Sequence, residues 1–209
     1  MCKLHIQPEW LPAFQEKKLD SMDAVLALEL VKTEECCLPC GVETFPLTPT
    51  VTLCLKRETE FACARIFREI LCGHAPQTRT FHERQAIALL HEAGFIVSQV
   101  VAWGEKSCFG LPRAGVLFLL APPGKTLPAF LAGELDAETR REAIEKVEAT
   151  LLALHSKGFF WPACRAANFI LLPGGEVGLL NLDSLKFHKT LSAEQGQQQF
   201  EVFYSSLSD

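Results

Sequence analysis

A break near the middle of the chain constrains its fold more than any other sequence feature. Pro122, Pro123 and Gly124 follow one another, and two prolines followed by a glycine end a helix or a strand. Strand-like periodicity dominates before this break and helical periodicity after it. A chain of 209 residues can form one ordinary domain or two small packed lobes, so the break suits a boundary between two lobes.

The part before the break is expected to contain most of the strands. Residues 51–57 alternate apolar and polar side chains, which is the period of a half-buried strand. Residues 95–103 and 116–121 are predicted to form two further strands. Residues 1–20 show no clear element and are interpreted as an arm or a short helix.

One helix is predicted among these strands, over residues 80–94. Thr80 is expected to cap its amino terminus, with Glu83 as the capping-box partner, and Gly94 is expected to end it. The residues predicted to line its apolar face are Ala86, Leu89, Leu90 and Ala93.

After the break, the sequence predicts a long helix, a hairpin and a tail helix. The long helix begins at Asp136 and is stopped by Gly158, with apolar residues at helical spacing between them. Residues 169–172 and 176–182 flank a Pro-Gly-Gly turn, which is typical of a β-hairpin. Residues 193–206 are expected to form the tail helix.

Charge and composition exclude several classes of function. The formal net charge is −5 and Lys and Arg are scattered, so the chain lacks the basic patch of a nucleic-acid-binding protein. No apolar run is long enough for a signal peptide or a membrane span, and we expect a cytoplasmic protein without a transmembrane segment. The nine Cys residues, an odd number, argue against a disulfide framework.

Three Cys residues form a local cluster with an interpretation of its own. Cys36, Cys37 and Cys40 make a CCxxC pattern, which is half of a zinc site. The nearest further Cys and His residues lack the paired spacing of a second half. A zinc or redox module is therefore a distant alternative to ordinary thiols.

The order of the predicted elements resembles the protein-kinase-like fold. The phrases LCLKR, HERQAIALLHEAGF, LHSKGFF, NFILL and LNLDSLKF are similar to those of bacterial lipopolysaccharide kinases that phosphorylate Kdo or heptose of the inner core. The resemblance covers about residues 24–206 and implies an α+β fold with two lobes. The implied parts are an amino-terminal arm (1–20), a small β-rich lobe with one main helix (21–121) and a shortened, mostly helical carboxyl-terminal lobe (122–209).

The resemblance also implies a site for ATP and Mg²⁺. In such kinases a strand lysine neutralises the nucleotide phosphates and a helix glutamate holds that lysine, and the matching residues are Lys56 and Glu83. An asparagine and an aspartate carry the metal ion, and the matching residues are Asn168 and Asp183.

The catalytic loop departs from the family pattern. Ala163 occupies the position of the general-base aspartate, and no Asp or Glu is near enough to replace it. Arg165 stands where related kinases often keep a basic residue that contacts the transferred phosphate. No glycine-rich loop is visible between Ala24 and Val51, and the short chain after Asp183 has no room for an activation segment, which argues against protein substrates.

Each of the four site residues also has an ordinary interpretation. Lysines like Lys56 protect edge strands from aggregation, and Glu83 in a capping box would turn away from Lys56. Asn168 is typical of a turn and Asp183 of a strand end. The order of all four matches one nucleotide site, which favours the functional interpretation.

Two functions remain open at this point. The first is a pseudokinase with a residual ATP and Mg²⁺ site that regulates or scaffolds an active kinase partner in lipopolysaccharide core modification. The second is a weak ATP-dependent kinase acting on heptose or Kdo, with peripheral association at the inner membrane. The local basic cluster available to an anionic substrate consists of Arg165, Lys186, His188 and Lys189.

Overall fold

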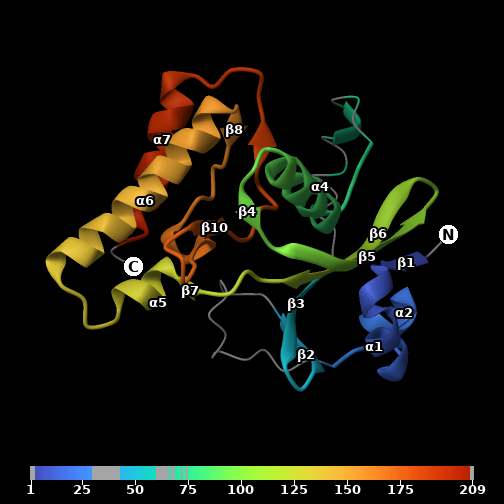
Figure 1. Cartoon of the computed structure of the whole chain (residues 1–209). Helices are drawn as coiled ribbons and strands as arrows, with labels where there is room; N and C mark the ends of the chain where they lie inside the picture. The colour runs from blue at the N-terminus through green and yellow to red at the C-terminus, as the bar shows by residue number, and fades with distance from the viewer. Residues whose placement is uncertain are drawn as a thin grey trace. The chain divides into compact units, whose positions relative to one another are not determined.

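The computed structural model describes residues 3–29, 43–59, 66, 69–71, 73 and 75–207. They form two compact units (Figure 1). The first unit takes in the described residues of 1–34, 41–85 and 99–120, and the second takes in 86–98 and those of 121–209. The cluster of Cys36, Cys37 and Cys40 lies outside the described residues.

The first unit is built on a five-stranded antiparallel sheet with the order β1-β5-β6-β3-β2. Its strands are β1 (Lys3–Ile6), β2 (Glu43–Thr48), β3 (Val51–Glu58), β5 (Gln99–Cys108) and β6 (Leu111–Leu120). The strand predicted at residues 51–57 is confirmed as β3. Strand β1 lies where the sequence shows no clear element, because its pairing with β5 is a long-range contact without a local signature.

One face of this sheet is covered by the amino-terminal helices η1 (Pro8–Trp10), α1 (Leu11–Glu16) and α2 (Met22–Leu26). Helix α2 approaches the sheet closely at Gly104, where a Cβ would clash with the Met22 sulfur. The largest fully buried side chains of the resulting core are Phe14, Met22, Leu47, Leu53, Leu55 and Phe118. Apolar burial on this face therefore sets the register of the sheet.

Helix α4 (Arg79–Glu92) begins against the opposite face, because a Cβ at Gly115 would clash with the Thr80 hydroxyl. Thr80 is not its cap. The Thr78 hydroxyl accepts the Phe81 N–H at 3.0 Å, so the predicted start is wrong by two residues. The predicted end is confirmed, since Gly94 has a φ of 85°.

The apolar face predicted for α4 is also wrong at one position. The Leu89 side chain is 46% exposed, whereas Ile87 is 5% exposed and packs inward. The buried face of the helix includes Glu83, Ala86, Ile87 and Leu90, so it contains a carboxylate that a purely apolar stripe would not predict.

The second unit contains a four-stranded sheet with the order β4-β10-β9-β7. Its strands are β4 (Ile96–Val97), β7 (Lys125–Thr126), β9 (Phe169–Leu171) and β10 (Val177–Leu179). The predicted hairpin is confirmed by the antiparallel pairing of β9 and β10. The single strand predicted at residues 95–103 is wrong, because β4 joins this sheet and β5 joins that of the first unit.

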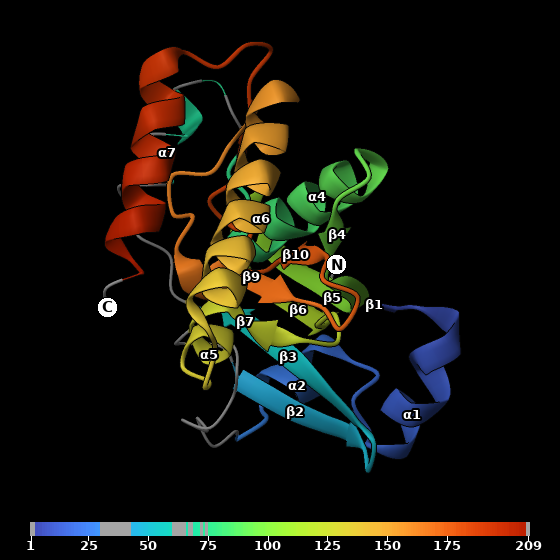
Figure 2. The ribbon, with the colours of Figure 1, turned by 60° about the vertical axis from the view of Figure 1, so that its left-hand side comes forward.

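The helices of the second unit are α5 (Leu127–Leu131), α6 (Ala137–Ser156) and α7 (Ala193–Ser205). Helix α6 begins next to Asp136 as predicted, and Asp136 is its cap. Hydrogen bonds from Thr139 lower the pKa of the Asp136 carboxyl group. Helices α6 and α7 lie alongside each other in both views (Figures 1 and 2). The Tyr204 hydroxyl links them by donating to Glu148 at 2.5 Å. Among the described helices, none is long and apolar enough to cross a membrane.

Candidate active site

Lys56 lies on β3 and points away from the apolar core of the first unit. Successive residues of a strand face opposite sides, so the burial of Leu55 in that core directs Lys56 to the face where α4 begins. Strand β3 is paired with β2 on one side and with β6 on the other. Lys56 is therefore not the protective lysine of an edge strand.

Lys56 and Glu83 form a buried ion pair. The Lys56 Nζ donates to both carboxylate oxygens of Glu83 at 2.7 Å. The two side chains are 16% and 1% exposed. The capping-box interpretation of Glu83 is therefore wrong, and the helix carboxylate holds the strand lysine.

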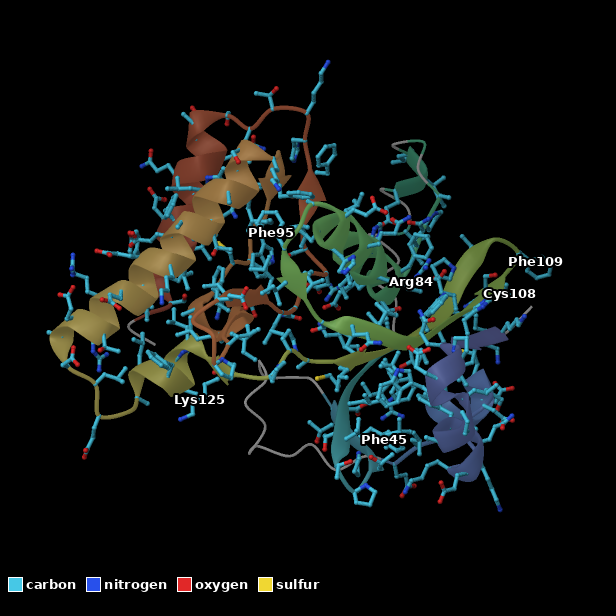
Figure 3. All side chains as sticks on the ribbon, viewed as in Figure 1. Phe45, Arg84, Phe95, Cys108, Phe109 and Lys125 are labelled. Atoms are coloured by element: carbon cyan, nitrogen blue, oxygen red, sulfur yellow. The ribbon has the colours of Figure 1, made fainter. Side chains whose placement is uncertain are left out.

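Several contacts hold the start of α4 in the position that this ion pair requires. The Thr78 hydroxyl donates to Glu105 Oε1 at 2.5 Å, and the Arg79 N–H donates to Glu58. The Arg84 guanidinium, labelled in Figure 3, lies 5.2 Å from the centre of the Trp103 ring. The helix is thus fastened to β3 and β5 on both sides of Glu83.

In the second unit, the predicted catalytic loop runs from Trp161 to Asn168 beside the segment that carries Asp183. Strands β8 (Phe159–Phe160) and β11 (Lys186–Phe187) pair at one end of the two segments. The Leu180 N–H donates to the Asn168 carbonyl at 2.8 Å at the other end. These links confine Asn168 and Asp183 to one neighbourhood.

Asn168 closes the catalytic loop on itself. It ends the short helix η2 (Ala166–Asn168), is 3% exposed, and its Nδ2 donates to the Ala163 carbonyl at 2.8 Å. The acceptor of this bond is the main-chain carbonyl of Ala163. The bond therefore does not depend on which side chain residue 163 carries. The amide oxygen of Asn168 is left as an acceptor.

The donor set of this neighbourhood fits Mg²⁺. An amide oxygen from Asn168 and a carboxylate from Asp183 are the hard oxygen ligands that this ion prefers. Asp183 is half-buried, and within the described part of the chain it makes no hydrogen bond or ion pair. Its carboxylate is therefore available to a cation.

Helix α7 holds the catalytic loop through Gln199, a residue that no sequence pattern singles out. Its buried side-chain Oε1 accepts the Trp161 N–H at 3.1 Å and lies 2.9 Å from His155 Nε2. Its carbonyl oxygen accepts the Cys164 thiol at 3.0 Å. Gln199 is one of three successive glutamines, and only the fold distinguishes it from its neighbours.

The residues of the predicted basic cluster do not share one pocket. Arg165 lines a pocket together with Arg140 of α6. Lys189 lines a different pocket, beside His155 at the end of α6. Lys186 is exposed on β11.

Comparison with known proteins gives the family. A model of the lipopolysaccharide kinase (Kdo/WaaP) family matches residues 56–207. The chain belongs to this family. No protein in a curated collection of sequences matches it.

Solved structures show the same kinase-like fold. The structure of WaaP in complex with acyl carrier protein is similar with a TM-score of 0.67 and 17% identity, over 98% of this chain and 80% of that chain. A co-crystal structure of WbdD with the kinase inhibitor LY294002 is similar with a TM-score of 0.53 and 20% identity, over 81% of this chain and 36% of that chain. The predicted α+β, protein-kinase-like fold is therefore confirmed.

The buried ion pair of this family member gives a stability prediction. Lys56→Met should lower the free energy of unfolding by about 3 kcal/mol, because it leaves the Glu83 carboxylate buried without its cation. Urea denaturation of Lys56→Met, Glu83→Leu and the double variant should show a coupling energy of about 1–3 kcal/mol.

The exposed ion pair between Lys106 and Asp23 serves as the matched control. Its side chains are 43% and 78% exposed, so Lys106→Met should change stability by less than about 0.5 kcal/mol. Additive effects of the two single substitutions at Lys56 and Glu83 would contradict the ion pair.

The catalytic loop gives a prediction about thiol reactivity. Burial raises the pKa of the Cys164 thiol to about 12, whereas Cys108 is exposed near the tip of the β5–β6 hairpin (Figure 3). Iodoacetamide at pH 8 should therefore alkylate Cys108 in the native protein and reach Cys164 only after unfolding in urea. Peptide mass spectrometry measures both sites, and equal native alkylation would show that the loop is not packed on α7.

Proposed function

We propose that the chain is a pseudokinase of the lipopolysaccharide kinase type, which binds ATP and Mg²⁺ and regulates or scaffolds an active kinase in lipopolysaccharide core modification. One observation carries this proposal. Asn168 still donates to the carbonyl of residue 163 as part of a closed catalytic loop, but residue 163 is an alanine. The loop is closed by this bond, but it has no carboxylate at the position of the general base.

Nucleotide binding is the retained part of the site. The Lys56 ammonium, held by Glu83, would neutralise nucleotide phosphates, and Asn168 and Asp183 would hold the metal ion. Bound Mg²⁺ would supply further positive charge to those phosphates. Glu83 orients Lys56, since its two oxygens hold the ammonium in one place.

Proton transfer is the missing part of the site. The loop from Trp161 to Asn168 contains no Asp, Glu or His, so none of its side chains can accept the proton of an attacking hydroxyl group. Loss of a general base typically costs a factor of about 10² to 10⁴ in rate. A chain with such a loop is better suited to binding than to turnover.

A partner role suits the family. A solved structure shows WaaP in complex with acyl carrier protein, so one protein of the same fold assembles with another protein. We infer a cytoplasmic location for this chain, with peripheral association at the inner membrane, and an active kinase as its partner.

Thermal denaturation with ATP tests nucleotide binding. Wild-type protein should melt at a higher temperature with ATP and Mg²⁺, because a ligand that binds only the folded state stabilises it. Asp183→Asn should lose most of the Mg²⁺-dependent part of this shift. Asp20→Asn, at an exposed aspartate of the first unit, is the matched control and should behave as the wild type. No shift in the wild type would leave scaffolding as the function.

The alternative function is a weak ATP-dependent kinase that phosphorylates heptose or Kdo of the inner core. The observation that favours it is the intact Lys56–Glu83 pair, which a purely scaffolding protein does not need. Charge neutralisation and positioning supply most of the catalysis in phosphoryl transfer, so a missing base reduces the rate without abolishing it.

Restoring the carboxylate separates the two functions. Ala163→Asp should raise transfer of phosphate from ATP to purified core oligosaccharide by a factor of about 10² to 10⁴, while Ala163→Asn, of the same size, should not. An active member of the family serves as the positive control. Wild-type turnover close to that of the control would contradict the pseudokinase proposal.

A further inference from the structure

A pocket of about 390 Å³ lies beside the catalytic loop in the second unit. It is bounded by α5, the start of α6, residues 165–167 of the loop and the residues that follow α7. These elements gather at one end of the unit in both ribbon views (Figures 1 and 2). The volume falls in the range of about 300–1,000 Å³ that is typical of small-ligand sites.

The charge of the pocket is positive although the protein as a whole is acidic. Among the described residues of its lining, Arg140 and Arg165 are the ionisable ones, and none is a carboxylate. The net charge of the chain is −5, so an excess of basic residues over the whole sequence does not explain why two arginines line the same pocket. Guanidinium groups bind carboxylates and phosphates through paired hydrogen bonds.

Both arginines are available to a ligand. Arg140 Nη2 donates to the Leu131 carbonyl at 2.8 Å, which holds the side chain at the pocket and leaves its other N–H groups free. In the part of the chain that the structure describes, neither Arg140 nor Arg165 contacts a carboxylate. The neighbouring Arg141, in contrast, pairs with Glu138 and Glu145.

The remaining wall of the pocket is mostly apolar, with Ser206 as its polar residue. Pro128, Leu131 and Leu207 present carbon surface, and Ala166 and Ala167 leave room because their side chains are small. The Ala166 N–H donates to the Ser206 hydroxyl at 2.7 Å, which fastens the loop to the end of α7. A ligand with an anionic group and a compact body that has C–H faces fits these walls.

We propose that this pocket binds the carboxylate or phosphate group of a sugar-sized acidic ligand through Arg140 and Arg165. Residues 165–167 line the pocket and Asn168 follows them directly in the chain, so the ligand would lie near Asn168. This inference rests on the proposed function in taking the ligand to be a sugar, and it adds that this sugar is acidic. The pocket itself is independent of nucleotide binding, which allows the two to be tested separately.

Calorimetric titration of the full, nucleotide-free chain tests the site. The probes are glucose 6-phosphate, glucuronate, inorganic phosphate and uncharged glucose. We expect at least one acidic sugar to bind and glucose not to bind. Competition by inorganic phosphate assigns the anion as a phosphate group, and selective binding of glucuronate assigns it as a carboxylate.

Arginine variants locate the site. Arg140→Gln and Arg165→Gln should each weaken binding of the acidic sugar at least tenfold, because each removes a charged donor. Arg141→Gln, one residue away on α6 and outside the pocket lining, should change it less than twofold. Arg165→Lys should retain part of the affinity, since it keeps the charge and loses the paired geometry.

The outcomes separate this inference from the proposed function. Binding that is unchanged in both Arg140→Gln and Arg165→Gln, or a failure of every acidic sugar to bind, would overturn the pocket assignment. A stabilising shift by MgATP together with that result would leave the nucleotide site standing. Sugar binding without any MgATP shift would support the pocket and remove the nucleotide site.

Discussion

A buried carboxylate dictates the arrangement of the first unit. Glu83 is 1% exposed, and an ionised group at that depth is tolerated only with a cation beside it. Lys56 supplies the cation from the face of the sheet opposite the apolar core. The helix must therefore begin where Thr78, Arg79 and Arg84 can fasten it to β3 and β5. The register of β3, the Thr78 cap of α4 and the contact of Arg84 with Trp103 together hold Lys56 and Glu83 next to each other.

The second unit meets a different constraint, which is to hold a loop without regular structure in one conformation. Backbone pairing of β8 with β11 closes one end, and the bond from Leu180 to Asn168 closes the other. The buried amide of Gln199 fastens the middle of the loop to α7. None of these bonds uses the side chain of residue 163. The fold therefore does not depend on which side chain stands at residue 163, which is the physical argument behind the proposed pseudokinase function.

Two neighbouring arginines at the start of α6 have different surroundings. Arg141 forms ion pairs with exposed carboxylates, and such pairs contribute little to stability. Arg140, one residue earlier, lines a hollow next to the catalytic loop and has a carbonyl as its partner. The charge and the shape of this pocket do not depend on the side chain at residue 163, so the proposed ligand binding is independent of the proposed loss of proton transfer.

The sequence by itself determined the elements whose signals are local. Strand alternation at residues 51–57, the Asp136 cap and the Pro-Gly-Gly hairpin turn follow from neighbouring residues, and the order of motifs indicated the family. Tertiary structure alone decided that Glu83 binds Lys56 instead of capping its helix, because both roles satisfy the same local pattern. It also decided that Gln199 is buried and that Arg140 faces the loop, since those contacts join residues that no local period relates.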